Sequence, residues 1–256
     1  MRKFSIIFSI LISVFTASAE EESWQPFAFP NAAFEGEIAG IALPTQPVAA
    51  RLNPAALAFF ERDRSFQVAN APMLDGSGYG VSASAAYSAK TFGVSAGYVG
   101  EVGAGVTHGF FGGLGGRVGQ IGFGASAAKL PGAANFSVDA GVLIPMQKEL
   151  RFAAVVTNAI SAPQLNVGVG MERETFHMEL NVRLPPLDQL ALGYRFSSAL
   201  AIYLHRFTIF GAGAYDTASQ AVLYNGGLGV WLNAHSSLMA QYSSTQRVTI
   251  ALATGL

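Results

Sequence analysis

The segment Phe176-His177-Met178-Glu179-Leu180-Asn181-Val182-Arg183-Leu184 places an apolar residue at every second position, with charged or polar residues between them. Successive side chains of a β-strand point to opposite faces. The segment therefore predicts a strand with one apolar face and one charged face. It does not predict an amphipathic helix, because the apolar residues of such a helix recur every three to four positions.

The same alternation recurs on both sides of this segment and predicts fifteen candidate strands. The candidates are 66–72, 78–90, 91–100, 102–111, 117–129, 134–145, 149–158, 164–173, 174–184, 188–197, 199–206, 207–216, 221–233, 236–244 and 246–255. Short turns separate them and no helical stretch intervenes, so neighbouring strands should pair antiparallel. Several candidates have the length of about ten residues that a tilted strand needs to cross a bilayer.

The composition decides between the two architectures that bury one face of each strand. Of the 256 residues only 12% are charged, whereas about 25% are charged in a typical soluble domain. A soluble β-sandwich would carry Lys, Glu and Asp on its outer face, but the second face here is mostly Gly, Ser, Ala and Thr. We therefore expect an all-β fold, an antiparallel transmembrane β-barrel of about fourteen strands, with twelve as the alternative. The glycine-rich stretch 100–124 suggests sharply curved strands.

The first residues of the chain have a different character. Arg2 and Lys3 precede an apolar stretch from Phe4 to Phe15, and Ala17-Ser18-Ala19 follows it. This stretch is shorter than the roughly twenty residues of a membrane-spanning helix. It has the pattern of a secretory signal peptide. We expect residues 1–19 to be that signal peptide, cleavage to occur near Ala19, and the mature chain to reach the outer membrane of a bacterium.

The segment 20–64 contains prolines and shows no alternation. Near its end, Asn53 can cap a short helix, and Pro54 suits the first helical position because it lacks the N–H that would stay unpaired there. Ala55 and Leu57 belong to the apolar helix-forming run that follows. A short apolar helix needs a packing partner, and a barrel of this size has room in its lumen. We expect this segment to be a hatch inside a barrel formed by 65–256.

The stretch Asn53-Pro54-Ala55-Ala56-Leu57-Ala58 follows Ala39-Gly40-Ile41-Ala42 and precedes the first expected strand. In this position it resembles the NPA(G/A)LA motif of FadL-like outer-membrane barrels. That superfamily includes long-chain fatty-acid transporters and the PorV/PorQ-type barrels of type IX secretion. The resemblance implies a barrel of about fourteen strands with an N-terminal hatch. In the transporters the hatch gates hydrophobic molecules, and in PorV-type members the barrel is a docking platform for secreted proteins.

Two features depart from the family pattern. The chain is shorter than typical members, which implies short extracellular loops and puts substrate capture by long loops in doubt. It also ends in Leu256 instead of the aromatic residue that is common in bacterial barrels.

Charges that must avoid lipid are the remaining candidate site residues. They are Arg51 in the hatch and Glu149, Arg151, Glu179, Arg183, Arg195 and Arg247 in the barrel. A charge on the lipid face costs about 2–4 kcal/mol at the membrane midplane, so we expect these side chains to face the lumen. They either brace the wall as ion pairs or line a selective pore. We favour bracing, because Arg51 and the hatch residues Glu35 and Glu37 offer partners.

The motifs that could indicate chemistry lack the required context. Gly93-Val94-Ser95-Ala96-Gly97 matches G-x-S-x-G, but alternation continues through it, whereas a nucleophile elbow needs a strand, a turn and a helix. The G-x-G-x-x-A match at Gly122–Ala127 also lies within an expected strand. The four histidines lack metal-ligand spacing, and the chain has no cysteine. We expect His177 to contact lumen arginines, and we expect no catalytic residue, metal or cofactor.

Three functions remain, in order of preference. The first is a non-catalytic outer-membrane barrel that passes or holds small hydrophobic molecules. The second is a structural or docking barrel for a partner protein, and the third is a barrel hydrolase that acts on lipid. The expected partners are outer-membrane lipid and either a hydrophobic small molecule or a protein. A formal net charge of −1 excludes a generally basic nucleic-acid-binding protein.

Overall fold

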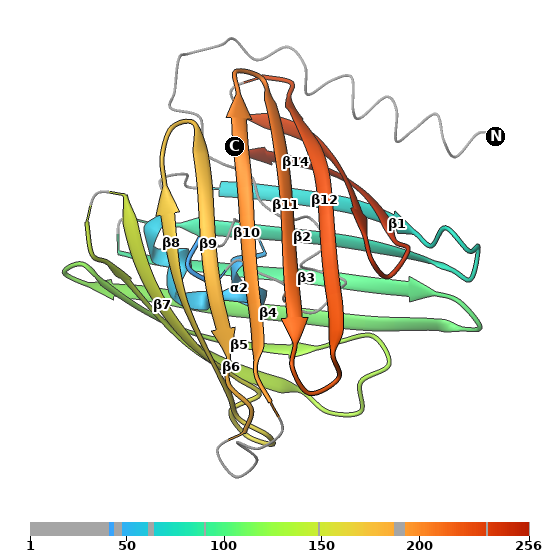
Figure 1. Cartoon of the computed structure of the whole chain (residues 1–256), viewed down its shortest axis with the longest axis horizontal. Coiled ribbons are helices and arrows are strands. Elements are labelled where there is room, and N and C mark those ends of the chain that lie inside the picture. Colours follow the sequence, from blue (N-terminus) through green and yellow to red (C-terminus); the bar gives the residue numbers. More distant parts are fainter. Residues whose placement is uncertain are drawn as a thin grey trace.

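The computed structural model describes residues 41–43, 48–60, 64–89, 91–147, 149–186, 193–233 and 235–255. Fourteen antiparallel strands form one closed barrel, in which each strand pairs with its neighbours in the chain and β1 pairs with β14 (Figure 1). The prediction of an all-β barrel with fourteen strands is confirmed. The expected signal peptide and the rest of the chain before residue 41 lie outside the described residues.

The strands share lengths of eight to thirteen residues. They are β1 (Arg64–Pro72), β2 (Tyr79–Ser88), β3 (Phe92–Val102), β4 (Val106–Val118), β5 (Ile121–Lys129), β6 (Ser137–Pro145), β7 (Leu150–Thr157), β8 (Gln164–Glu172), β9 (Phe176–Arg183), β10 (Arg195–Leu204), β11 (Phe207–Asp216), β12 (Ala221–Trp231), β13 (Ser236–Ser243) and β14 (Val248–Gly255). Among the described residues that precede β1, two short helices form, α2 (Ala49–Leu52) and the 3₁₀-helix η3 (Pro54–Phe59).

Two strand predictions were wrong. The candidates 188–197 and 199–206 correspond to a single strand, β10, because its ladder runs without a break from Arg195 to Leu204. The expected boundary between 102–111 and 117–129 was also wrong, since β4 continues to Val118. Glycines 112–116 keep their ladder partners on both sides, so they do not end the strand.

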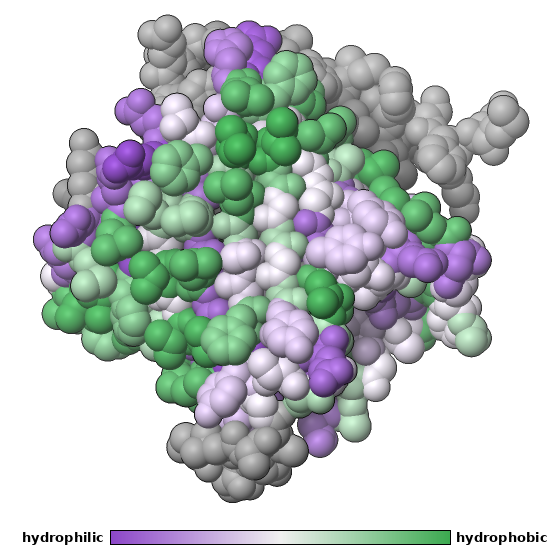
Figure 2. Space-filling model, in the orientation of Figure 1, coloured by the Kyte–Doolittle hydropathy of each residue, from purple (hydrophilic) through white to green (hydrophobic). Residues whose placement is uncertain are grey.

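The alternation along each strand separates the outer face from the lumen face. On β9, Met178 and Leu180 are 39% and 57% exposed, whereas Glu179 between them is 3% exposed. Figure 2 shows hydrophobic residues spread over the outer surface of this side of the barrel. Among the described strand residues, only Arg64 and Lys129 carry a charge on the outer face. Such an exterior suits contact with lipid.

The connections at the two ends of the barrel differ in length. We call the end with the start of β1 and the end of β14 the terminal rim, and the opposite end the loop rim. Turns at the terminal rim are as short as 119–120 and 205–206, whereas the loop rim carries the longer connections 130–136 and 158–163. Short turns on one rim and longer loops on the other are typical of outer-membrane barrels.

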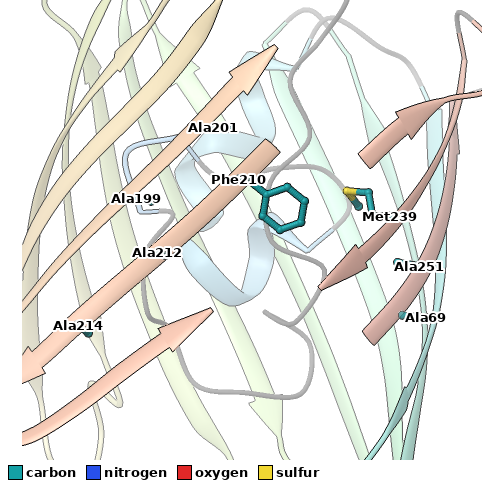
Figure 3. Packing of buried hydrophobic residues seen from close by; sticks show 8 residues of the cluster. All are labelled: Ala69, Ala199, Ala201, Phe210, Ala212, Ala214, Met239 and Ala251. Atoms are coloured by element: carbon teal, nitrogen blue, oxygen red, sulfur yellow. The ribbon is translucent and has the colours of Figure 1, made fainter. Parts of the chain in front are cut away.

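Residues 41–43 and 48–60, the hatch segment, lie inside the barrel. Helix η3 contacts the inner face of β2 to β6, and α2 contacts β3 to β5. In Figure 3 the helices are enclosed between strands of opposite walls. Within the described part of the chain, none of the helices is both long and apolar enough to span a membrane.

Candidate functional site

Asn53 organises the hatch segment as the sequence predicts, and its role extends further. Its backbone is extended, and its Oδ1 accepts a hydrogen bond of 3.1 Å from the Ala55 N–H, so it caps η3 with Pro54 at the first position. Its Nδ2 donates to the carbonyl oxygens of Ile41 at 2.9 Å and Val142 at 3.2 Å. One fully buried side chain thus joins the helix, the preceding strip of chain and the wall at β6.

Glu179 anchors the start of the hatch segment. Its Oε1 accepts hydrogen bonds from the Ile41 and Ala42 N–H groups at 2.7 and 3.2 Å, and its Oε2 accepts one from Leu43 at 3.0 Å. All four residues are buried. The sequence predicts that Glu179 faces the lumen, and it does, but its contacts are with backbone N–H groups of the hatch segment. Hydrogen bonds to a charged acceptor are the stronger class in proteins.

Inward-facing glycines form the surface on which the hatch segment lies. A Cβ added at Gly115 or Gly124 would overlap the backbone of Pro54, and one at Gly93 would overlap the Leu57 carbonyl. We call this set the glycine seat; it comprises Gly93, Gly113, Gly115, Gly122, Gly124, Gly141, Gly168 and Gly170. Gly113, Gly115, Gly122 and Gly124 belong to the stretch 100–124 that suggests curved strands, and at these positions the missing side chain also allows close approach of the hatch segment.

Two further contacts fix the C-terminal part of the hatch segment. Ser88 Oγ donates a hydrogen bond of 2.9 Å to the Leu57 carbonyl oxygen, and the Arg117 guanidinium lies 5.8 Å from the centre of the Phe59 ring. Leu57 is fully buried. The described hatch segment is therefore held against β2 to β9 from Ile41 to Phe59, by polar anchors as well as by apolar packing.

The other half of the lumen wall has a different lining. Buried alanines and two larger apolar residues face inward from β1, β10, β11, β13 and β14 (Figure 3). We call this set the alanine wall; it comprises Ala69, Ala199, Ala201, Phe210, Ala212, Ala214, Met239 and Ala251. Figure 3 shows Phe210 and Met239 pointing into the lumen. Buried polar side chains, among them Gln67, Thr208 and Gln241, flank this apolar set on the same inner face.

The predicted lumen charges lie mainly toward the two rims. Arg151 pairs with Glu172 toward the terminal rim. Toward the loop rim, Arg195 lies 3.6 Å from Asp216, and Arg183 donates to Asn166 at 2.7 Å. These contacts link neighbouring strands, as the bracing hypothesis expects. Arg51 lies on α2 and is half-buried, whereas Glu35 and Glu37 fall outside the described residues.

Glu149 does not face the lumen, so this prediction was wrong. It lies in the turn between β6 and β7, where its half-exposed carboxylate accepts a hydrogen bond of 2.8 Å from Arg173. Glu149 is the last residue of this turn, directly before β7. The alternating pattern of β7 therefore does not extend to this position. The pair connects two turns of the terminal rim.

Arg247 contacts a distant strand. Its Nη2 donates a hydrogen bond of 2.9 Å to Glu101 Oε1 at the end of β3. Arg247 immediately precedes β14, so the ion pair reaches across β1 and β2 on the lumen side. Small residues, Ala71 on β1 and Gly80 on β2, stand opposite each other in this region. The pair spans the junction of β1 and β14, where the barrel closes.

We expect this ion pair to stabilise barrel closure. Glu101→Gln and Arg247→Gln should each lower the free energy of unfolding by about 1–2 kcal/mol, because each removes a partly buried charged hydrogen bond. The double variant should lose less than the sum of the two. The measurement is the temperature at which the folded barrel loses its fast migration on unboiled gels. If the losses of the two single variants added up fully in the double variant, a direct interaction between the two residues would be contradicted.

His177 contacts different groups from those expected. Its Nε2 lies 3.4 Å from Glu172, its direct partner across β8 and β9, and its ring packs edge-on against Tyr203 at 5.2 Å between centroids. A serine-type hydrolase needs a hydroxyl hydrogen-bonded to its base. In the part of the chain that the structure describes, no hydroxyl makes that bond to His177. Ser95 lies mid-strand in β3, so G-x-S-x-G forms no elbow.

The comparisons with known proteins found similar structures but no matching family model or curated sequence. No protein-family model matches the chain, and no curated protein matches its sequence. The structure resembles that of the outer membrane protein Omp33 of Acinetobacter baumannii, with a TM-score of 0.54 and 9% identity over 76% of this chain and 98% of that chain. A triple mutant of Rhodopseudomonas blastica porin matches with a TM-score of 0.49 and 7% identity, over 75% and 98%.

The likeness to Omp33 shows that this chain has the fold of an outer-membrane β-barrel. None of these matches bears a FadL-type or PorV-type name, so that resemblance continues to rest on the hatch motif at Asn53–Ala58.

Proposed function

We propose that the chain is an outer-membrane barrel that passes or holds small hydrophobic molecules, with the loop rim facing outward. The observation that carries the proposal is the alanine wall, a set of apolar lumen residues between two charged rims. A pore for ions or sugars needs polar or charged groups at its narrow part. Here the described charges of the wall gather toward the ends of the strands, apart from Glu179, which is occupied by the hatch segment, and Arg51 is carried by the hatch segment itself.

The residues at the loop-rim end of the lumen favour an amphipathic molecule as the ligand, as the fatty-acid-transporter resemblance suggests. A cavity of about 330 Å³ lies there, and its lining includes Arg183, Arg195 and Asp216. The inward residues next along β10 and β11 toward the middle of the barrel are Ser197 and Ala214, so the lining becomes less charged with depth. Guanidinium groups near an apolar strip suit a carboxylate with a hydrocarbon tail.

The test compares two variants with side chains of similar shape and opposite polarity. Ala212→Asn should reduce uptake of a fluorescent fatty acid into proteoliposomes about tenfold, because its amide is costly to bury beside an apolar ligand. Ala212→Leu keeps the wall apolar and should reduce uptake less. Equal uptake by the two variants, or wild-type uptake no faster than in protein-free liposomes, would refute the proposal.

A docking barrel is the second candidate, and the firm seating of the hatch segment favours it. Glu179, Asn53 and Ser88 hold backbone groups of that segment, and the glycine seat fits it closely. A permanently seated segment would suit a barrel whose rim, instead of its lumen, does the work. Absence of both liposome swelling and fatty-acid uptake, together with co-purification of a partner protein, would favour this function over transport.

A further inference from the structure

The outer face of the barrel carries two charged residues, although charges are rare on lipid-facing walls. Of the described strand residues, Lys129 and Arg64 are the two charged ones that face outward, at the loop rim and the terminal rim respectively. The cost of a charge beside lipid is smallest at the interfaces. Both residues lie at strand ends, which puts them at the level of lipid headgroups.

Two aromatic residues lie next to Lys129. Phe110 stands directly opposite it on β4, and the Lys129 ammonium lies 5.8 Å from the centre of the Phe136 ring. Tyr98 stands opposite Phe110 on β3, with ring centroids 5.4 Å apart. Phe110 and Phe136 are 58% and 64% exposed. In the part of the chain that the structure describes, no carboxylate forms an ion pair with Lys129.

The imidazole of His108 contacts Tyr98 and completes this set of residues. The Tyr98 hydroxyl lies 2.8 Å from Nδ1 of His108, which is exposed on the same outer face as Phe110. Gly100 stands opposite His108, and a Cβ there would lie 2.5 Å from the Tyr98 hydroxyl oxygen. A glycine at this position thus lets the phenol reach the imidazole. In the tautomer in which the Tyr98 hydroxyl donates to Nδ1, Nε2 carries the ring proton and can donate to an external ligand.

We propose that these residues bind the phosphate of an outer-leaflet glycolipid. The site, the loop-rim cluster, comprises Tyr98, His108, Phe110, Lys129 and Phe136. Lys129 supplies the charge that complements a phosphate, and His108 donates from Nε2. The exposed rings pack against the acyl chains below the headgroup, as aromatic girdles do. The inference depends on the proposed outer-membrane location with the loop rim outward.

The test uses the full-length barrel in detergent with an equimolar mixture of bisphosphorylated lipid A and its dephosphorylated form. Native mass spectrometry should show the wild type retaining the phosphorylated lipid about tenfold more than the other form, the ratio expected for one charge-assisted contact. Lys129→Gln should abolish this preference, and His108→Gln should weaken it. Arg64→Gln, the matched control at the opposite rim, should keep it.

Equal loss of preference in Lys129→Gln and Arg64→Gln would overturn the proposal, as would a wild type without preference. Displacement of the lipid by millimolar inorganic phosphate would also overturn it, because the site would then recognise the free anion without the acyl chains. Lys129 lies outside the lumen, so fatty-acid uptake by Lys129→Gln should equal that of the wild type. Failure of transport and failure of lipid binding are therefore separable.

Discussion

Replacing Glu179 by alanine is expected to detach the start of the hatch segment. The change removes the carboxylate that accepts three backbone hydrogen bonds from residues 41–43 and leaves buried N–H groups without that partner. We expect the hatch segment bound to the barrel wall to lose about 3 kcal/mol of stability. This loss raises the fraction of molecules with a detached segment roughly a hundredfold. Trypsin cleavage after Arg51, measured by mass spectrometry, should accelerate, and single-channel conductance should rise.

Two further variants identify the cause. Glu179→Gln keeps one acceptor oxygen in the same place and should show an intermediate cleavage rate. Glu172→Gln also removes a lumen carboxylate, but Glu172 contacts Arg151 and His177, outside the hatch segment. Its cleavage rate at Arg51 should remain that of the wild type. Equal acceleration in the Glu172 and Glu179 variants would mean that lumen charge in general, and not this anchor, holds the segment.

Adding a side chain to the glycine seat should have an equally large effect. Gly115→Val would drive Cβ into the Pro54 carbonyl and close to Leu57. Because the groups in contact belong to the backbone on both sides, they can move apart only at a high energetic cost. We therefore expect the free energy of unfolding to fall by about 3 kcal/mol or more. The folded fraction on unboiled gels should fall, and the molecules that fold should show rapid cleavage at Arg51.

The adjacent residue supplies the control. Gly116 faces outward on the same strand, where the nearest atom to an added Cβ is 3.8 Å away. Gly116→Val should fold with the wild-type yield and keep Arg51 protected. If Gly115→Val yields no folded barrel, Gly115→Ala tests the same contact with less added volume. Indistinguishable behaviour of the variants at 115 and 116 would show that the seat does not depend on missing side chains.

Much of the fold was predictable from local pattern. The side chains of β9 alternate between lipid and lumen as the quoted segment indicates, and Asn53 and Pro54 begin a helix as their chemistry predicts. The pattern failed before β10, because the apolar alternation begins several residues ahead of Arg195, where the paired strand starts. Alternation identifies the two faces of a strand, but ladder pairing decides where the strand begins.

The anchoring roles could not be read from the sequence. Glu179 looks like any lumen charge, because its partners are backbone N–H groups more than 130 residues away. The glycine seat was ambiguous, since β4 carries glycines on both faces and only Gly113 and Gly115 meet the hatch segment. A search for glycines that repeat on the lumen face of successive strands is the signal that would have found it. Arg247 and Glu101 are also far apart in the chain, so no local pattern connects them.

The glycine seat also constrains the order of assembly. At the seat positions the strands have no side chain, so their inner face is covered there by residues that precede β1. Once β1 has paired with β14, that segment could enter only by threading through an open rim. Association of the hatch segment with β3 to β6 should therefore come before the ring closes. The segment would then act as a template around which the sheet curls, and the pairing of the first and last strands would be a late folding event.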